Sequence, residues 1–255
     1  MILVIDIGNT NIVFGLYEGD VLRGILRVET GPAVSAKDYA DKLRAFLEAE
    51  QVPVSKLKGS IIASVVPEVD AVIKEACRIC LKREPVFVSH EIDMGLKICY
   101  ENPKQAGIDR IVNSVAAFDK YKQAVIVIDF GTATTFDYVS SEGEFKGGVI
   151  SPGIKISAEA LFEKASKLPR VDLVTPEKVI CTDTVTNMQA GIVFGNAGLV
   201  DGIVKKIKKE AGTEPYVVAT GGLASLIFPY SDTIDVVYDY LTLYGLKIIF
   251  ERNEC

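Results

Sequence analysis

One short pattern occurs twice in this chain, and the repeat restricts the possible folds more than any other feature of the sequence. Residues 2–11 read ILVIDIGNTN, and residues 125–135 read VIVIDFGTATT. In both copies an apolar, β-branched run, typical of a buried strand, ends at an aspartate that is followed two positions later by a glycine. The two aspartates, Asp6 and Asp129, lie close to half a chain length apart. The repeat therefore predicts a duplicated structure.

The segments that follow each copy also correspond. Residues 12–17 and 135–139 have the pattern of strands, and each is followed by a glycine-bearing turn and a further strand, at 21–28 and 145–150. Beyond them, helical periodicity alternates with short apolar strands, which predicts parallel pairing within an α/β unit. We therefore expect an α/β fold with two duplicated halves that face each other across a cleft.

The first loop carries groups that suit a phosphate. Gly8 permits a tight turn and a close approach of backbone to a ligand, and Asn9, Thr10 and Asn11 add groups that can hold phosphate oxygens. The loop has no Lys or Arg, so an acid beside a polyanion would be repelled unless a cation lay between them. Asp6 therefore suggests Mg²⁺, shared with the phosphates through oxygen or water ligands. A plain hairpin turn explains the same residues, and the loop alone leaves both interpretations open.

Asp109 is a second candidate for chemistry. It follows an Asn-Pro turn and stands near the start of a helical pattern at residues 111–118, where an N-cap is expected. Arg110 follows it directly, and Tyr100 precedes the turn. An acid beside a fixed cation is also how a base and an anion clamp for an alcohol substrate are arranged. The residues alone leave open whether Asp109 is a helix cap or a base.

The C-terminal half contains an unusually polar stretch at residues 182–189. It precedes a long helix expected at 190–210, which Asp183 or Thr184 could cap. Three glycines stand at near-helical spacing in this helix, namely Gly191, Gly195 and Gly198. Such spacing indicates close helix packing more than catalysis.

Two further glycine-rich segments lie in the same half. The strand expected at residues 216–219 ends in Gly221 and Gly222, and a Gly-Gly pair there lets a flat base lie against the backbone. A tight turn from strand to helix explains the pair as well. The segment 147–153, GGVISPG, indicates a loop that leads into a helix at 154–167, and we assign no contact to it.

Composition excludes several classes of protein. A net charge of -6 and a pI of about 5.0 argue against a general nucleic-acid binder. The apolar runs are too short to span a bilayer and the N-terminus enters a strand at once, so a soluble cytoplasmic protein is expected. Five scattered cysteines do not resemble a disulfide framework, and the close pair Cys77 and Cys80 is expected to be buried thiols. The single histidine, His90, is expected at the surface.

Taken together, these motifs resemble those of a known superfamily. Two strand-Asp-x-Gly loops followed by strand-Thr-Gly-Gly resemble the phosphate and adenosine motifs of the actin, sugar-kinase and Hsp70 ATPases. Within that superfamily the sequence is similar to the type III pantothenate kinases. Seven motifs carry this resemblance, in order and over essentially the whole chain: DIGNTN (6–11), GIDR (107–110), IDFGTATT (128–135), GGVISPG (147–153), TDTVTNMQAG (182–191), ATGG (219–222) and LTLYGL (241–246).

The resemblance implies a fold and an activity. Two ribonuclease H-like, actin-like ATPase halves, residues 1–115 and 116–255, would flank a nucleotide cleft. The activity would be ATP-dependent phosphorylation of pantothenate to 4′-phosphopantothenate, the first step of coenzyme A biosynthesis. ATP, Mg²⁺ and a monovalent cation, K⁺ or NH₄⁺, would be the cofactors. The family is typically a cytoplasmic homodimer with its sites near the interface, and we expect no nucleic-acid or membrane partner.

The same resemblance implies roles for individual residues. Asp109 would be the general base, Asp6 would act on Mg²⁺ through water, and Asp129 would bind the monovalent cation. The residues that would bind the nucleotide are Asp6, Ile7, Gly8, Asn9, Thr10, Asn11, Ile12, Val13, Thr132, Gly221 and Gly222. The residues that would hold pantothenate are Tyr100, Gly107, Ile108, Asp109, Arg110 and, from across the dimer, Thr184.

Two departures from the family and two alternative functions are also considered. Cys181 and Asn187 stand where the family more often has a small residue and a serine, which could alter contacts near Thr184. The alternative enzyme is another small-molecule kinase of the superfamily, for example one that acts on a sugar, although Tyr100 and Arg110 favour an acceptor with a carboxylate. The alternative class is a regulatory protein that binds nucleotide without turnover, which the retained aspartates disfavour.

Overall fold

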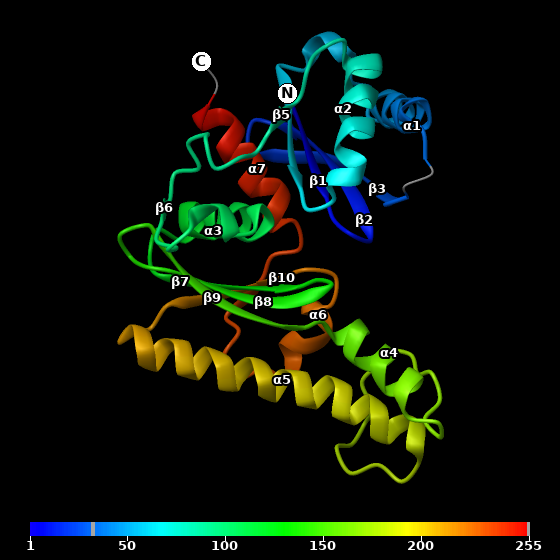
Figure 1. Cartoon of the computed structure of the whole chain (residues 1–255), viewed down its shortest axis with the longest axis vertical. Coiled ribbons are helices and arrows are strands. Elements are labelled where there is room, and N and C mark those ends of the chain that lie inside the picture. Colours follow the sequence, from blue (N-terminus) through cyan, green and yellow to red (C-terminus); the bar gives the residue numbers. More distant parts are fainter. Residues whose placement is uncertain (32–33, 254–255) are drawn as a thin grey trace. The chain divides into compact units, whose positions relative to one another are not determined.

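The structure, a computed structural model, describes residues 1–31 and 34–253 and consists of two compact units. Figure 1 identifies the helices and strands along the chain. Unit 1 comprises residues 1–96, residues 102–116 and the chain from Thr242 onward. Unit 2 comprises residues 97–101 and 117–241.

These units differ from the predicted ranges 1–115 and 116–255 in two places. Residues 97–101 belong to unit 2 because β6 (Lys97–Ile98) pairs in parallel with β9 (Glu144–Pro152) of that unit. The C-terminal helix α7 (Leu241–Arg252) belongs to unit 1 from Thr242 onward because it packs on a helix there. Both exceptions come from long-range pairing, which a division by sequence order does not capture.

Unit 1 is built on a five-stranded sheet with the order β3-β2-β1-β4-β5. Its strands are β1 (Ile2–Ile7), β2 (Asn11–Glu18), β3 (Val21–Glu29), β4 (Gly59–Ser64) and β5 (Val86–Phe87). The first three strands form an antiparallel meander, whereas β4 pairs in parallel with β1, and β5 with β4. Residues 2–5 of β1 are all buried, as expected for a continuous apolar run in the centre of a covered sheet.

Two amphipathic helices complete the core of unit 1. They are α1 (Ala36–Ala49) and α2 (Pro67–Leu81), and their apolar residues form one cluster with those of β1 and β2. The start of α1 is fixed by a capping box, in which Ser35 and Asp38 each accept the backbone N–H of the other at 3.2 Å. Short 3₁₀ turns lie at η1 (Val54–Lys56) and η2 (Pro103–Gln105).

The helices α3 (Ile108–Tyr121) and α7 approach each other closely within unit 1. A Cβ atom on Gly245 of α7 would lie 2.2 Å from the carbonyl oxygen of Val112, so only glycine fits at this contact. Nearby, the hydroxyl of Thr242 donates to Oδ1 of Asn113, a buried residue of α3, at 2.7 Å.

Unit 2 is built on a six-stranded sheet with the order β11-β10-β7-β8-β9-β6. Its further strands are β7 (Val125–Phe130), β8 (Ala133–Val139), β10 (Tyr216–Thr220) and β11 (Val236–Val237). The helices are α4 (Ile154–Lys164), α5 (Thr184–Ala211) and α6 (Ala224–Ile227), followed by the 3₁₀ turn η3 (Phe228–Tyr230). Figure 1 shows α5 as one long, unbroken helix. One stripe of α5, with Val193, Val200 and Val204, packs in a single core cluster with residues of β7 and β10.

The two sheets repeat one topology, which confirms the predicted α/β fold with duplicated halves. The orders β3-β2-β1-β4-β5 and β9-β8-β7-β10-β11 correspond strand by strand, with an antiparallel meander followed by two parallel strands. Even the register irregularities correspond: one lies between Leu16 and Tyr17 of β2, and the other between Tyr138 and Val139 of β8.

Several element boundaries differ from those expected. α5 begins at Thr184 rather than at residue 190, because Asp183 is its N-cap and accepts the backbone N–H of Thr186 at 3.0 Å. α3 begins at Ile108 rather than at residue 111, and α4 ends at Lys164 rather than at 167. His90, expected at the surface, is half-buried.

Candidate functional site

The first predicted phosphate loop is the turn between β1 and β2 in unit 1. The N–H of Gly8 donates to the carbonyl of Asn11 at 3.0 Å, which closes the turn. Thr30, which follows β3, holds the same turn from the side: its hydroxyl donates to the carbonyl of Gly8 at 2.7 Å, and its N–H donates to the carbonyl of Thr10 at 3.0 Å. The side chains of Asn9 and Thr10 are exposed. The loop is thus fixed in shape while its polar groups remain accessible.

The residues that flank this loop divide into two groups. Asp6 is half-buried and lies in register with Val13 of β2 and Ala63 of β4. Ile7 and Ile12 have no exposed surface and belong to the core cluster of unit 1. Only main-chain groups of Ile7 and Ile12 could therefore reach a ligand, whereas the carboxylate of Asp6 could do so directly.

The segment Gly107 to Arg110 forms the start of α3, also in unit 1. Because the carbonyl of Gly107 accepts the N–H of Ile111 at 3.1 Å, the helix begins directly after Gly107. Asp109 is therefore the second residue of the helix rather than its N-cap. Its Oδ1 accepts the N–H of Arg110 at 2.9 Å, and an acid in the first helical turn is stabilised by the helix dipole. Ile108 and Asp109 are half-buried, and Arg110 is buried.

Gly107 lies directly against the carboxylate of this aspartate. A Cβ atom at residue 107 would lie 2.6 Å from Oδ1 of Asp109. The glycine therefore allows the carboxylate to fold back over the start of the helix. The motif Gly-Ile-Asp-Arg thus has a local structural reason for its first and third residues.

The second predicted loop joins β7 to β8 in unit 2. The N–H of Gly131 donates to the carbonyl of Ala133 at 3.0 Å, and both Gly131 and Thr132 are exposed. Gly153, at the end of the segment to which we had assigned no contact, packs directly on this loop: a Cβ atom there would lie 2.1 Å from the carbonyl oxygen of Thr132. The glycine-rich segment 147–153 therefore supports the second loop.

Asp129 and the Gly-Gly segment meet in unit 2. β10 pairs in parallel with β7, so that Thr220 lies in register with Asp129. Gly221 follows with a φ of +91°, and a Cβ atom there would lie 2.4 Å from Oδ1 of Asp129. Gly221 therefore needs to be glycine both for its backbone conformation and for its contact with Asp129. Gly222 is exposed, and no described atom lies within 4 Å of the position its Cβ would take.

Tyr100, a predicted pantothenate-binding residue, lies in unit 2. Tyr100 follows β6, and its ring stacks at 5.5 Å from the ring of Phe145 on β9. A Cβ atom on Gly147, whose φ is +114°, would lie 3.2 Å from the Tyr100 ring. Tyr100 is therefore held against the sheet by an aromatic neighbour and a glycine.

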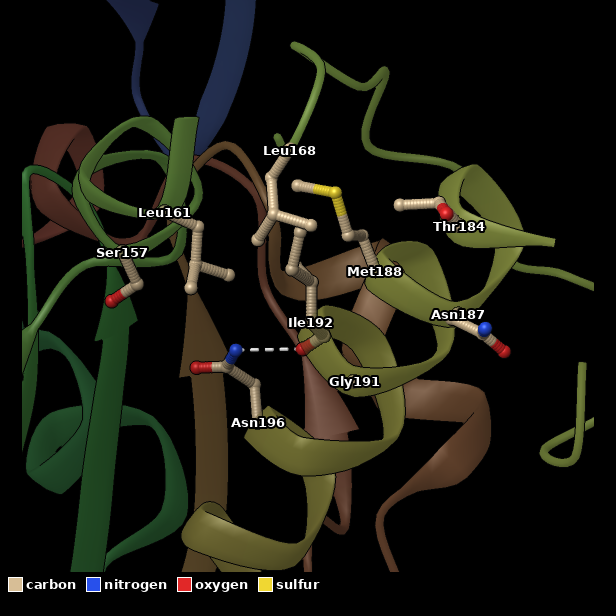
Figure 2. A pocket seen from close by; sticks show the side chains of 9 residues that line it. All are labelled: Ser157, Leu161, Leu168, Thr184, Asn187, Met188, Gly191, Ile192 and Asn196. Carbon is tan, nitrogen blue, oxygen red and sulfur yellow. Dashed lines mark hydrogen bonds between the residues drawn. The ribbon is translucent and has the colours of Figure 1, made fainter. Parts of the chain in front are cut away.

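Thr184 lines a pocket of about 440 Å³ between α4 and α5. Figure 2 shows the apolar side chains that converge in this pocket, namely Leu161, Leu168, Met188 and Ile192. Asn187 also lines the pocket, but its amide points away from these apolar groups (Figure 2). The pocket thus has an apolar centre, and the polar side chains of Ser157, Thr184 and Asn196 lie around it (Figure 2). Cys181 lies three residues before Thr184, and its Sγ contacts the carbonyl of Lys178 at 3.0 Å.

The pKa values of Asp183 and Cys77 are shifted by their surroundings. The hydroxyl and N–H of Thr186 donate to Asp183 and hold the pKa of that carboxyl below its usual value. Burial raises the pKa of the Cys77 thiol to about 12, which makes it unreactive. Cys77 and Cys80 are both buried free thiols, as predicted. In residues 1–31 and 34–253 no three His, Cys, Asp or Glu side chains gather into a group that could hold a metal ion.

Sequence reasoning missed two supporting residues. Thr30 lies 22 positions after Gly8, whose carbonyl it binds, and no local pattern points to it. Gly153 belongs to a predicted loop, but its contact with Thr132 depends on the pairing of β8 with β9.

In the described part of the chain, none of the helices is long and apolar enough to cross a membrane.

The sequence is similar to that of known proteins over its whole length. A family model described as type III pantothenate kinase matches residues 2–206. The type III pantothenate kinase of Citrifermentans bemidjiense is 50% identical over 254 residues, which cover all of both chains.

Solved structures with low sequence identity resemble the chain in fold. One is a Campylobacter jejuni protein, named as a proposed Baf family transcriptional activator, with a TM-score of 0.62 and 19% identity over 98% of each chain. Another is the ROK hexokinase of Thermus thermophilus, with a TM-score of 0.53 and 12% identity over 97% of each chain. At such identities the likeness shows the fold, which is that of the actin-like ATPases and sugar kinases with two ribonuclease H-like halves. By the match of its sequence over its whole length, the chain belongs to the type III pantothenate kinase family.

Proposed function

We infer that this chain catalyses the ATP-dependent phosphorylation of pantothenate, the first step of coenzyme A biosynthesis. The observation that carries this inference is the 50% identity with a type III pantothenate kinase over the whole of both chains. The reaction transfers the γ-phosphoryl group of ATP to the terminal hydroxyl of pantothenate and yields 4′-phosphopantothenate and ADP. Such a transfer requires positioning, cations that offset the phosphate charge, and a group that takes the alcohol proton.

Asp109 is the general base of this proposal. Its carboxylate is half-buried and is oriented by the N–H of Arg110. Asp109 lies in the first turn of α3, two residues after Gly107, and its bond with the N–H of Arg110 also gives it a structural role at the start of this helix. An alcohol is a weak nucleophile, so the base assists late, as charge develops on the attacking oxygen.

The nucleotide binds to the two loops and to the Gly-Gly segment. In the first loop, main-chain groups of residues 6–13 and the side chains of Asn9, Thr10 and Asn11 contact the phosphates. Thr132 contacts them in the second loop, and Gly221 and Gly222 border the adenine. The support is that Asn9, Thr10, Thr132 and Gly222 are exposed on loops whose shapes are fixed by hydrogen bonds or close glycine contacts.

Two cations complete the nucleotide site of this proposal. Asp129 holds a monovalent cation, K⁺ or NH₄⁺, and the support is that its half-buried carboxylate lies near the end of β7, directly before the exposed loop residues Gly131 and Thr132. Asp6 binds Mg²⁺ through water. Because no three acidic, His or Cys side chains gather in the described part of the chain, phosphate and water oxygens supply most of the ligands of Mg²⁺, as is common for this ion. Bound there, the cations offset the charge of the phosphates.

The protein binds the carboxylate of pantothenate and the other polar groups of this substrate. The buried Arg110 and the hydroxyl of Tyr100 suit an acceptor that carries a carboxylate. Gly107, Ile108 and Thr184 complete the site. Tyr100 is preorganised by its contacts with Phe145 and Gly147, which lowers the entropic cost of binding.

The chain forms a homodimer through α4, α5 and the segment between them. Seven large apolar side chains of this region are exposed: Ile156, Leu161, Phe162, Val174, Val179, Ile180 and Val185. The glycines of α5 also support this interface. No described atom lies within 4 Å of a Cβ built at Gly191, Gly195, Gly198 or Gly202. A second copy would cover both features, and sedimentation velocity of the wild-type chain tests whether it is a dimer.

The enzyme works in the cytoplasm, where ATP is available.

The activity is tested by ATP turnover with pantothenate and Mg²⁺, in K⁺ or NH₄⁺ against Na⁺. We expect phosphopantothenate to form in K⁺ or NH₄⁺ and much less in Na⁺. Asp109→Asn should lower kcat by about a hundredfold or more because it removes the base. The matched control is Asp119→Asn, near the other end of α3, which should leave turnover close to wild type.

The outcomes separate the parts of the proposal. Turnover that survives in Asp109→Asn would show that Asp109 is not the general base, whereas the kinase activity would still be supported. Turnover with a sugar but not with pantothenate would make the chain a sugar kinase. ATP binding without turnover of any acceptor would favour a regulatory protein.

A further inference from the structure

A second pocket lies at the C-terminal end of α5 in unit 2, and neither the proposed reaction nor the proposed dimer uses it. Its volume is about 550 Å³, and lysines from the last turns of α5 line it together with residues that follow the helix. Figure 1 shows α5 along its whole length. The Thr184 pocket lies at the start of this helix and the second pocket at its end.

The charge of this pocket is opposite to that of the whole chain. Lys205, Lys208 and Lys209 line it, against a single acid, Glu214. The chain as a whole has 34 acidic and 28 basic residues. The pocket is therefore a local region of positive charge on an acidic protein, which is the arrangement that attracts an anion.

Two of the three lysines are available to a ligand. Lys208 pairs with Glu214 at 2.9 Å. Lys205 and Lys209 are exposed and form no ion pair with any residue in 1–31 or 34–253. The nearby carboxylate of Asp201, which feels the charge of Lys205, is already occupied by hydrogen bonds from the loop at residues 231–233.

The hydroxyl groups of the pocket are held in place. Thr233 donates its hydroxyl to Oδ1 of Asp201 at 2.8 Å, and its N–H donates to the same oxygen at 3.2 Å. Thr213 shares a hydrogen bond of 3.3 Å with the hydroxyl of Tyr138. The two threonines of the pocket are thus held in place before any ligand arrives, which lowers the cost of binding.

We propose that this pocket binds a small polyphosphate anion of the di- or triphosphate type. The end of a helix carries a partial negative charge of about half a unit, which opposes an anion. Three ammonium groups against one carboxylate outweigh that partial charge, and the net attraction grows with the number of negative charges on the ligand. Ammonium groups suit the separate oxygens of a phosphate chain, whereas a planar carboxylate is better matched by arginine.

The proposal is tested by calorimetric titration of the full chain with tripolyphosphate at low salt. Orthophosphate is titrated in parallel. Because tripolyphosphate could also enter the nucleotide loops, the share that binds in the pocket is taken from the lysine variants below. We expect tripolyphosphate to bind about tenfold more tightly than orthophosphate, and its affinity to fall as salt is added. Because the titration measures binding alone, its result is independent of whether the chain phosphorylates pantothenate.

Matched double variants locate the site. Lys205→Ala with Lys209→Ala should weaken tripolyphosphate binding by about tenfold, since it removes the two unpaired cations. Lys37→Ala with Lys56→Ala removes the same charge from residues of unit 1, on α1 and η1, that do not line the pocket, and should change binding by less than about twofold. All four lysines are exposed, so both variants should fold. No binding to the wild-type chain, equal binding of orthophosphate and tripolyphosphate, or equal losses in the two double variants would overturn the proposal.

Discussion

The two loops that follow Asp6 and Asp129 have the same topology but are held in different ways. In unit 1 a side chain holds the loop, since the hydroxyl of Thr30 binds the carbonyl of Gly8 at 2.7 Å. In unit 2 backbone from two other segments packs against Asp129 and its loop, where Gly221 and Gly153 leave no room for a Cβ atom. A duplicated motif can therefore keep its shape while one copy depends on a hydrogen bond and the other on the absence of side chains.

The largest effect on stability is expected from Gly153→Ala, which adds one methyl group to the segment that supports the second loop. In Gly153→Ala the new Cβ would lie 2.1 Å from the carbonyl oxygen of Thr132 and 2.8 Å from that of Gly131. Because both atoms are backbone, the loop has to move, and we expect a loss of about 3 kcal/mol in the free energy of unfolding. The φ of Gly153 is -67°, so the loss would come from overlap rather than from backbone strain. Thermal and urea denaturation measure it.

Two alanine variants serve as references for this prediction. Gly8→Ala places a Cβ 3.2 Å from the carbonyl oxygen of Asn11, a tight contact that should cost about 1 kcal/mol or less. Gly222→Ala meets no described atom within 4 Å and should be close to neutral. If Gly153→Ala were no less stable than Gly8→Ala, the proposed contrast between the two loops would be wrong.

The same contrast extends to the crossover connections of the two sheets. In unit 1, β4 and β5 are connected by α2, which spans 15 residues and buries six apolar side chains. In unit 2, β10 and β11 are connected by α6 and η3, and α6 buries only two residues. The shorter crossover depends instead on Asp201, whose carboxylate accepts bonds from Ser231, Asp232 and Thr233. A polar anchor thus replaces apolar burial.

An intermediate effect is therefore expected for Asp201→Asn. Oδ2 of Asp201 accepts the N–H of Asp232 at 3.0 Å, and Oδ1 accepts that of Thr233 at 3.2 Å. Either orientation of an amide would leave one backbone N–H facing an NH₂ group, which should cost about 2 kcal/mol. Asp232→Asn is the control, because the Asp232 side chain is exposed.

The difference between wild type and Asp201→Asn should depend on pH. Burial alone would raise the pKa of Asp201, but the hydrogen bonds from Ser231, Asp232 and Thr233 outweigh it and lower the pKa. The contribution of the carboxylate to stability is therefore full above its unfolded pKa of about 3.9, and it is lost as the pH falls through the lower folded pKa. Melting curves from pH 7 down to the acid limit should show the two proteins converge, and a constant difference would rule out this origin.

The sequence predicted what is local and missed what is long-range. An apolar run that ends in Asp-x-Gly is a local pattern, so both loops and the duplication could be predicted from it. The contact between Asp129 and Gly221 was not predicted, because it depends on the parallel pairing of β7 with β10, which are far apart in sequence. The support given by Thr30 and Gly153, and the anchor at Asp201, come from residues far away in sequence whose types are common in turns and helices. The expected N-cap at Asp109 was displaced because the neighbouring Gly107 can begin the helix.

The smallest effect should come from Thr30→Val, which tests the side-chain support of the first loop. Valine has nearly the same shape but leaves the carbonyl of Gly8 without its partner at 2.7 Å, while the N–H of residue 30 can still bind the carbonyl of Thr10. A half-exposed hydrogen bond of this kind contributes about 1 kcal/mol, so the melting temperature should fall slightly. If the loop binds phosphate, KM for ATP should rise by about threefold with little change in kcat, as when uniform binding is lost. Thr30→Ser keeps the hydroxyl and should restore both values, whereas failure of serine to do so would assign the effect to packing of the methyl group and not to the hydrogen bond.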